Sequence, residues 1–127
     1  MVASLMMLWH LVLMKPRAGL PEAERQTLLD AFDRAVREIP SVRDVHVGRR
    51  VRHGAGYEAA MPDSADFIVA IAFDDLAGLQ AYLRHPAHDD LGARFGRSLS
   101  SALIYDFEVG EWKQPRSGLE RFLLQSE

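Results

Sequence analysis

Apolar residues change their spacing along the chain, and each change marks a boundary between a predicted strand and a predicted helix. Residues 6–14 are apolar at both alternating positions, a pattern typical of a strand covered on both faces. In residues 21–39 the apolar positions recur at spacings of three and four, which predicts an amphipathic helix. Residues 41–51 place valines among polar residues in an imperfect alternation, which indicates a second strand with one exposed face.

The pattern in the second half of the chain predicts a strand, two helical segments and a last strand. Residues 67–73 are again apolar at both parities. Residues 74–83 predict a short helix capped by Asp74 or Asp75, and apolar residues at 91, 95 and 99 predict another helical segment. Residues 101–109 predict the last strand. Between the halves, residues 52–66 hold two glycines and a proline and predict a long loop.

This order of elements predicts an α+β, ferredoxin-like βαββαβ fold with a four-stranded antiparallel sheet. Helices cover only one face of such a sheet, so strands that are apolar at both parities need a second cover. A second copy of the chain, packed sheet to sheet, would supply it and form a dimeric α+β barrel. We expect residues 1–109 to form this domain and residues 110–127 to form a C-terminal extension that docks on either subunit.

Composition narrows the class of protein. The chain has 127 residues, enough for one domain with a real core. It has no cysteine, which excludes disulfides and thiolate catalysis and leads us to expect a cytoplasmic protein. A net charge of -3 with dispersed basic residues argues against a nucleic-acid partner. The apolar residues 1–14 lack a basic leader and are too short to span a bilayer, so we expect a mature strand and no membrane partner.

The segment YLRHPAH, residues 82–88, carries the candidate chemistry. A residue before proline avoids the α conformation, so one helix should end near His85 and the next should begin at Pro86. His88 then lies in a first helical turn, where unpaired amides and the helix dipole favour a neutral imidazole, the form a general base needs. Tyr82 lies on the apolar stripe of its helix, and its hydroxyl needs a partner at a pocket edge.

Each histidine also has a structural interpretation. In this interpretation, His88 bonds a backbone carbonyl at a helix start, and His10, within an apolar strand, is satisfied inside the core. His46 and His53 are expected at the surface. His85, before Pro86, is expected to cap or turn the chain.

A metal site is not expected. His85, His88 and Asp89 have a possible spacing, but the proline break disrupts a shared helical face and no third ligand of clear identity is present. We therefore expect no cofactor. The predicted catalytic residues are His88 and Tyr82. The predicted ligand-binding residues, which line an apolar pocket, are His10, Val12, Leu29, Phe32, Val69 and Ile104.

Five segments resemble one family: WHLVLMK, REIPSVRDVHVG, DFIVAIAFDD, LQAYLRHPAHDDLG and IYDFEV. Together they cover roughly residues 8–109, and the Tyr-x-x-His-Pro-Ala-His segment is the most specific. On these residues the chain is identified as resembling the stress-responsive A/B barrel (Dabb) domain family. The resemblance implies a dimeric α+β barrel.

The resemblance also implies a chemistry. A polyketide cyclase of this family closes a linear tetraketide thioester by an intramolecular aldol condensation, and its motif carries a catalytic tyrosine and histidine that fall here on Tyr82 and His88. Its strand histidine matches His10. That cyclase has a further pocket histidine where this chain has Phe67, which makes the pocket here less polar.

Three functions follow as hypotheses. The first is a homodimer with cyclase-like acid/base chemistry, a lyase that needs no cofactor. The second is a homodimer that binds a small apolar ligand containing a carbonyl group without converting it. The third, by analogy of fold alone, is a barrel-type monooxygenase.

Overall fold

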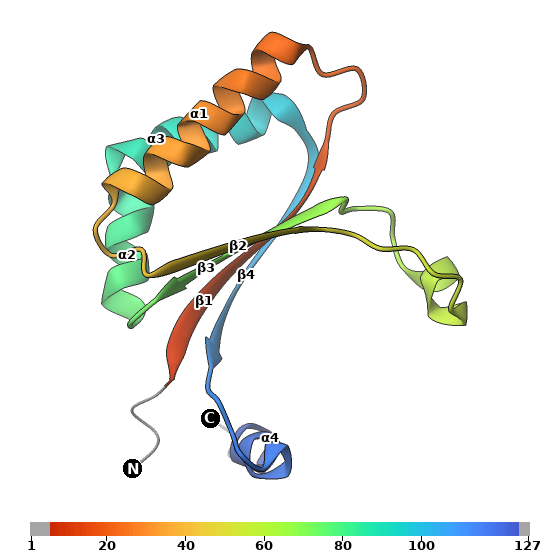
Figure 1. Cartoon of the computed structure of the whole chain (residues 1–127), viewed down its shortest axis with the longest axis vertical. Coiled ribbons are helices and arrows are strands. Elements are labelled where there is room, and N and C mark those ends of the chain that lie inside the picture. Colours follow the sequence, from red (N-terminus) through yellow and green to blue (C-terminus); the bar gives the residue numbers. More distant parts are fainter. Residues whose placement is uncertain (1–5, 125–127) are drawn as a thin grey trace.

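The computed structural model describes residues 6–124, which form a sheet with helices on one side and a separate C-terminal helix (Figure 1). The elements, in chain order, are β1 (Met7–Pro16), α1 (Glu22–Glu38), β2 (Asp44–Arg49), the 3-10 helix η2 (Gly56–Ala60), β3 (Phe67–Phe73), α2 (Leu76–Arg84), α3 (Pro86–Ser98), β4 (Leu99–Val109) and α4 (Pro115–Leu124).

The sheet is antiparallel, with the strand order β2-β3-β1-β4. The predicted ferredoxin-like α+β fold is therefore confirmed. Helices α1, α2 and α3 lie on the same side of the sheet (Figure 1). The loop predicted over residues 52–66 contains the short helix η2, and β4 begins two residues before the predicted strand because the backbone is already extended at Leu99.

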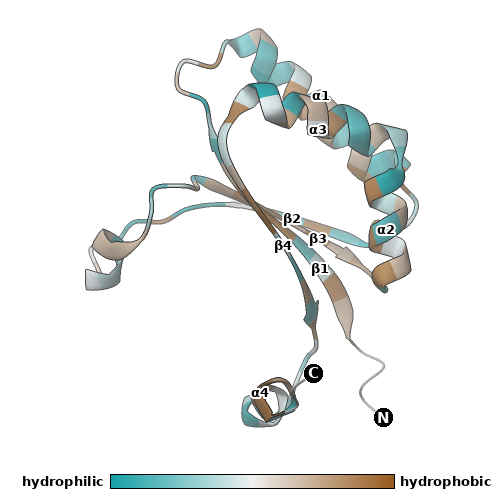
Figure 2. Cartoon of the chain, turned by 180° about the vertical axis from the view of Figure 1, so that it is seen from behind, coloured by the Kyte–Doolittle hydropathy of each residue, from teal (hydrophilic) through white to brown (hydrophobic). Residues whose placement is uncertain are grey.

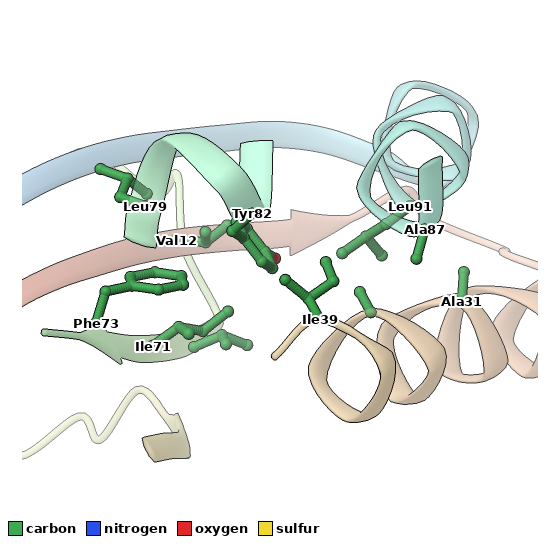
Figure 3. Packing of buried hydrophobic residues seen from close by; sticks show 11 residues of the cluster. Val12, Ala31, Ile39, Ile71, Phe73, Leu79, Tyr82, Ala87 and Leu91 are labelled. Carbon is green, nitrogen blue, oxygen red and sulfur yellow. The ribbon is translucent and has the colours of Figure 1, made fainter. Parts of the chain in front are cut away.

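The core lies between the helices and one face of the sheet (Figure 3). The small Ala31 and Ala35 are buried on α1, which lets that helix approach α3 closely. The buried cluster is completed by Val12, Ile39, Val69, Ile71, Phe73, Leu79, Tyr82, Ala87 and Leu91.

The helix break predicted at Pro86 is confirmed, together with the capping role of His85. His85 has an extended backbone, and its Nδ1 accepts a hydrogen bond of 3.0 Å from the backbone N–H of Ala87. Asp75 caps α2 in the same way, accepting 3.0 Å from the N–H of Gly78. Tyr82 near the end of α2 and His88 at the start of α3 are thereby held on two helices that meet at this corner.

The two faces of the sheet differ, and the side chains that alternate along strand β1 show this. His10 and Val12 point toward the helices and are buried, so alternation places Trp9, Leu11 and Leu13 on the opposite face. We call that opposite side the open face, since helices α1 to α3 do not cover it (Figure 2). By register with β1, the β4 residues on the open face are Leu103, Tyr105, Phe107 and Val109.

The N-terminal expectation is met in part. Residues from Met7 onward form β1 as predicted, whereas residues 1–5 lie outside the described part of the chain. Across residues 6–124, every helix is too short or too polar to cross a membrane.

Two leucines on α2 test the location of the core. Leu79 is 3% exposed and Leu76 is 55% exposed. We expect Leu79→Ala to lower the free energy of unfolding by about 2–5 kcal/mol, because it leaves a cavity. The matched Leu76→Ala should change it by about 0.5 kcal/mol or less. Urea unfolding at equal protein concentration measures both, and equal effects would contradict this core.

Candidate functional site

A cavity of about 530 Å³ lies between the helix-covered face of the sheet and helices α1 to α3. Its volume falls within the range of small-molecule sites. Its wall is mainly apolar, and four side chains that can exchange protons or accept hydrogen bonds reach it, each from a different element. They are His10 on β1, Tyr82 on α2, His88 on α3 and Asp106 on β4.

Tyr82 stands at the centre of this group. Its ring is 2% exposed and lies with its centroid 5.2 Å from that of Phe73, 5.7 Å from His10 and 4.8 Å from His88. Its hydroxyl makes no hydrogen bond with any residue from 6 to 124. Within those residues, every side-chain oxygen that is fully shielded from solvent has a hydrogen-bond partner, so the hydroxyl of Tyr82 is not fully shielded. The hydroxyl is therefore accessible from the cavity, where a ligand can accept its proton in a hydrogen bond.

Burial also determines the charge of this tyrosine. Loss of solvent raises the pKa of Tyr82 to about 12, because the phenolate would be poorly solvated. The hydroxyl consequently keeps its proton over the ordinary pH range. It is suited to donate a hydrogen bond to a carbonyl oxygen and unsuited to act as a base.

His88 is set up for the opposite task. Its pKa lies below the ordinary 6.5, first because burial penalises the imidazolium and second because of the positive charge that His10 can carry. Asp89 and the backbone of Leu83 oppose this shift without cancelling it. A neutral imidazole has one nitrogen without a proton, and that nitrogen can accept one.

His10 is paired with Asp106 across the β1–β4 ladder. The two residues are register partners, and Nδ1 of His10 lies 2.6 Å from Oδ1 of Asp106. An ionised carboxylate only accepts hydrogen bonds, so Nδ1 carries the proton and Nε2 is left for other partners. His10 is thus satisfied by a hydrogen bond inside the core, as one interpretation predicted, and it also lines the cavity.

Asp106 was not among the residues predicted from sequence. The available signal was its parity: it is an acidic residue within the apolar strand 101–109, on the same side as Ile104. Recognising it also required the β1–β4 register, which brings together residues 96 positions apart.

The cavity gathers most of the predicted ligand-binding residues. Val12, Phe32, Val69 and Ile104 line it with His10. Leu29 lies elsewhere: it is 57% exposed and lines an adjoining, strongly apolar cavity of about 440 Å³.

The two cavities adjoin each other. Phe32, Val69, Phe95 and Leu99 line both, and Phe67 contributes to the second alone. Phe67 therefore lies on the far side of Val69 from the histidines and contributes its ring to the neighbouring chamber.

Metal binding finds no support in the geometry of residues 6–124, where no three histidine, aspartate or glutamate side chains converge. His85 uses its Nδ1 to cap α3. His46 and His53 are surface residues as expected, each beside an acidic side chain. Chemically, the cavity offers a neutral imidazole, a protonated phenol and a histidine–carboxylate pair beside an apolar chamber, a set suited to proton transfer next to a carbonyl group.

Comparison with known proteins gives the following matches. Residues 8–109 match the profile of the family described as Stress responsive A/B Barrel Domain. Olivetolic acid cyclase from Cannabis sativa is 26% identical over 98 residues, covering 77% of this chain and 92% of the cyclase.

Solved structures with the same fold include a dimeric ferredoxin-like protein of unknown function from Thermobifida fusca, at 21% identity and a TM-score of 0.63. That alignment covers 82% of this chain and 92% of the other. Hydroxynitrile lyase from Passiflora edulis aligns with a TM-score of 0.69 at 10% identity, covering 85% and 97%. These structural matches support the fold.

The charge state of His88 can be measured by NMR titration. We expect a pKa below 6.5, and Asp89→Asn should lower it further, because Asp89 favours the imidazolium. Asp90→Asn is the matched control, since Asp90 pairs with Arg94 and has no part in the shift. A value above 6.5, or equal effects of the two substitutions, would contradict this electrostatic arrangement.

Proposed function

The chain belongs to the stress-responsive A/B barrel domain family, and from that premise we propose that it is a homodimer that closes a small poly-carbonyl compound into a ring by an aldol reaction. In this proposal, the apolar cavity holds the substrate and no cofactor takes part. The observation that carries the proposal is the unpartnered hydroxyl of buried Tyr82 beside the neutral imidazole of His88 in one cavity.

The proposed reaction begins with a proton transfer. The free nitrogen of His88 takes a proton from the carbon next to a substrate carbonyl, and the electron pair of the broken C–H bond forms an enolate. Tyr82 donates a hydrogen bond to the enolate oxygen. The enolate carbon then attacks a second carbonyl carbon of the same molecule, forming a C–C bond. His88 then gives this proton to the new alkoxide oxygen and returns to its neutral form.

The pair His10–Asp106 would support the second half of this sequence. The carboxylate of Asp106 orients the imidazole of His10, so that Nε2 can bind a polar group of the substrate. The likeness to olivetolic acid cyclase supports the reaction class. The adjoining apolar chamber has room for a hydrocarbon part of the substrate.

The dimer in this proposal rests on the open face of the sheet. Large apolar side chains there remain in solvent in a single chain, including Tyr105 at 52% and Phe107 at 49% exposure. Packing against the same face of a second copy would bury them. The solved protein from Thermobifida fusca, which has this fold, is dimeric. Absence of cysteine suits a reducing cytoplasm as the location.

A second candidate function is binding without conversion. It is favoured by Phe67, which replaces the polar residue of the related cyclase, and by the largely apolar walls of both cavities. Native mass spectrometry of freshly purified protein would support it by detecting an unmodified ligand.

Catalysis is tested with a panel of poly-β-keto thioesters. We expect His88→Ala to lower kcat/KM about 10²- to 10⁴-fold, because the general base is lost. Tyr82→Phe should lower it about 10²- to 10³-fold, because a hydrogen bond to the developing oxyanion is lost while the ring remains. The rate should rise with pH through a midpoint below 6.5, as His88 loses its proton.

His53→Ala is the control for these rates, since His53 lies in the exposed loop before η2. It should leave turnover unchanged. Turnover that persists in His88→Ala would refute the assignment of the base, and absence of turnover with bound, unchanged thioester would favour the binding function.

The oligomeric state is tested separately by light scattering. We expect a mass of two chains at micromolar concentration, because the open face of a single chain leaves apolar surface in water. Tyr105→Glu should shift the protein toward monomer, whereas Tyr57→Glu, on the exposed η2, should not. A monomeric wild type would refute the dimer.

A further inference from the structure

The helix α4 lies outside the part of the chain that matches the family, which ends at residue 109. It is displaced from the end of β4 toward the side of the sheet opposite α1 to α3 (Figure 1). Its packing on the other helices and strands within residues 6–124 is slight. Nothing in the cavity chemistry uses it.

The position of α4 is nevertheless defined by one aromatic contact. Gly118 is buried against the indole ring of Trp112, so closely that a Cβ at this position would lie 2.7 Å from Cδ1 of the ring. Gly110 is similarly close to Met6 and Trp112. Because a side chain at Gly118 would clash, the glycine fixes which side of α4 packs on Trp112 and the end of β4.

An apolar stripe on α4 begins beside this contact, since Leu119 and Phe122 line one groove with Gly118 and Trp112. Leu119, Phe122 and Leu123 are spaced by three and four residues, so they share one helical face. They are 61%, 45% and 75% exposed. Burying such a stripe is what normally stabilises a short helix, because helices of this length are marginal alone in water.

The stripe is continuous with the open face of the sheet. A groove of about 370 Å³ between β4 and α4 is lined by Val109, Trp112, Leu119 and Phe122. Val109 also belongs to the open face, in line with Phe107.

We propose that this stripe packs against the second copy in the dimer and enlarges its interface beyond the family domain. The inference rests on the dimer of the proposed function. A second copy seated on the open face covers Phe107 and Val109, and the apolar surface runs on from Val109 through the groove to Leu119. Two-fold symmetry makes the contact reciprocal, so that both copies of α4 lose exposed apolar surface together.

The test compares a double substitution in the stripe with a control substitution elsewhere on α4, both in the full chain. The double substitution Leu119→Glu and Leu123→Glu should raise the dimer dissociation constant about 10- to 100-fold, measured by analytical ultracentrifugation. Leu124→Glu is the matched control: Leu124 is 77% exposed but lies about 140° around the helix from Leu119. It should leave the constant unchanged.

A second measurement avoids acidic substitutions. The chain has no cysteine, so Leu123→Cys can be labelled with a benzophenone maleimide and irradiated. We expect covalent dimers, and fewer from Leu124→Cys. A dimeric wild type whose dissociation constant is unmoved by the double substitution, or that yields no covalent dimer from Leu123→Cys, would overturn the role of α4 alone. A monomeric wild type would overturn the dimer itself.

Discussion

Strand β1 has to bury apolar side chains on both of its faces, and this requirement organises the molecule. It pairs with β3 on one side and β4 on the other, so it lies inside the sheet. Toward the helices it presents His10 and Val12, and toward the open face Trp9 and Leu11. Three helices satisfy the first face. Within residues 6–124 the second face stays open (Figure 2), and in the proposed dimer a second copy would cover it, so the proposed interface and the cavity lie on opposite faces of the same strand.

The site depends on how that core turns at one corner. Pro86 ends one helix and begins another, and His85 caps the new helix with its own ring nitrogen. The turn brings the imidazole of His88 to within 4.8 Å, centroid to centroid, of the buried ring of Tyr82. Burial then acts in opposite directions on the two groups: it lowers the pKa of His88 and raises that of Tyr82. One low-polarity environment thus prepares both a base and a hydrogen-bond donor.

The C-terminal helix differs from the other helices in how its apolar surface is placed. In the family domain, apolar surface is buried by helices within the chain. In α4 the Gly118–Trp112 contact holds the helix in place while Leu119 and Leu123 stay exposed. Because α4 does not line the cavity between α1–α3 and the sheet, the proposed chemistry and the proposed assembly can be tested by separate substitutions.

Much of this structure follows from sequence periodicity alone. Apolar residues at both parities in the strands, the proline in the HPAH segment and the spacing of three and four in the helices predict the ferredoxin-like fold, the break before His88 and the apolar side of Tyr82. These are local features, determined by backbone geometry within a few residues.

Asp106 and Leu29 show where local reasoning stops. Asp106 is paired with His10, which is 96 residues away, through strand register, and Leu29 lines the neighbouring chamber instead of the cavity that holds the histidines. Sequence determined which residues could do chemistry and which had to be buried. Tertiary structure decided which of them meet, because register and helix packing are set by contacts between distant segments.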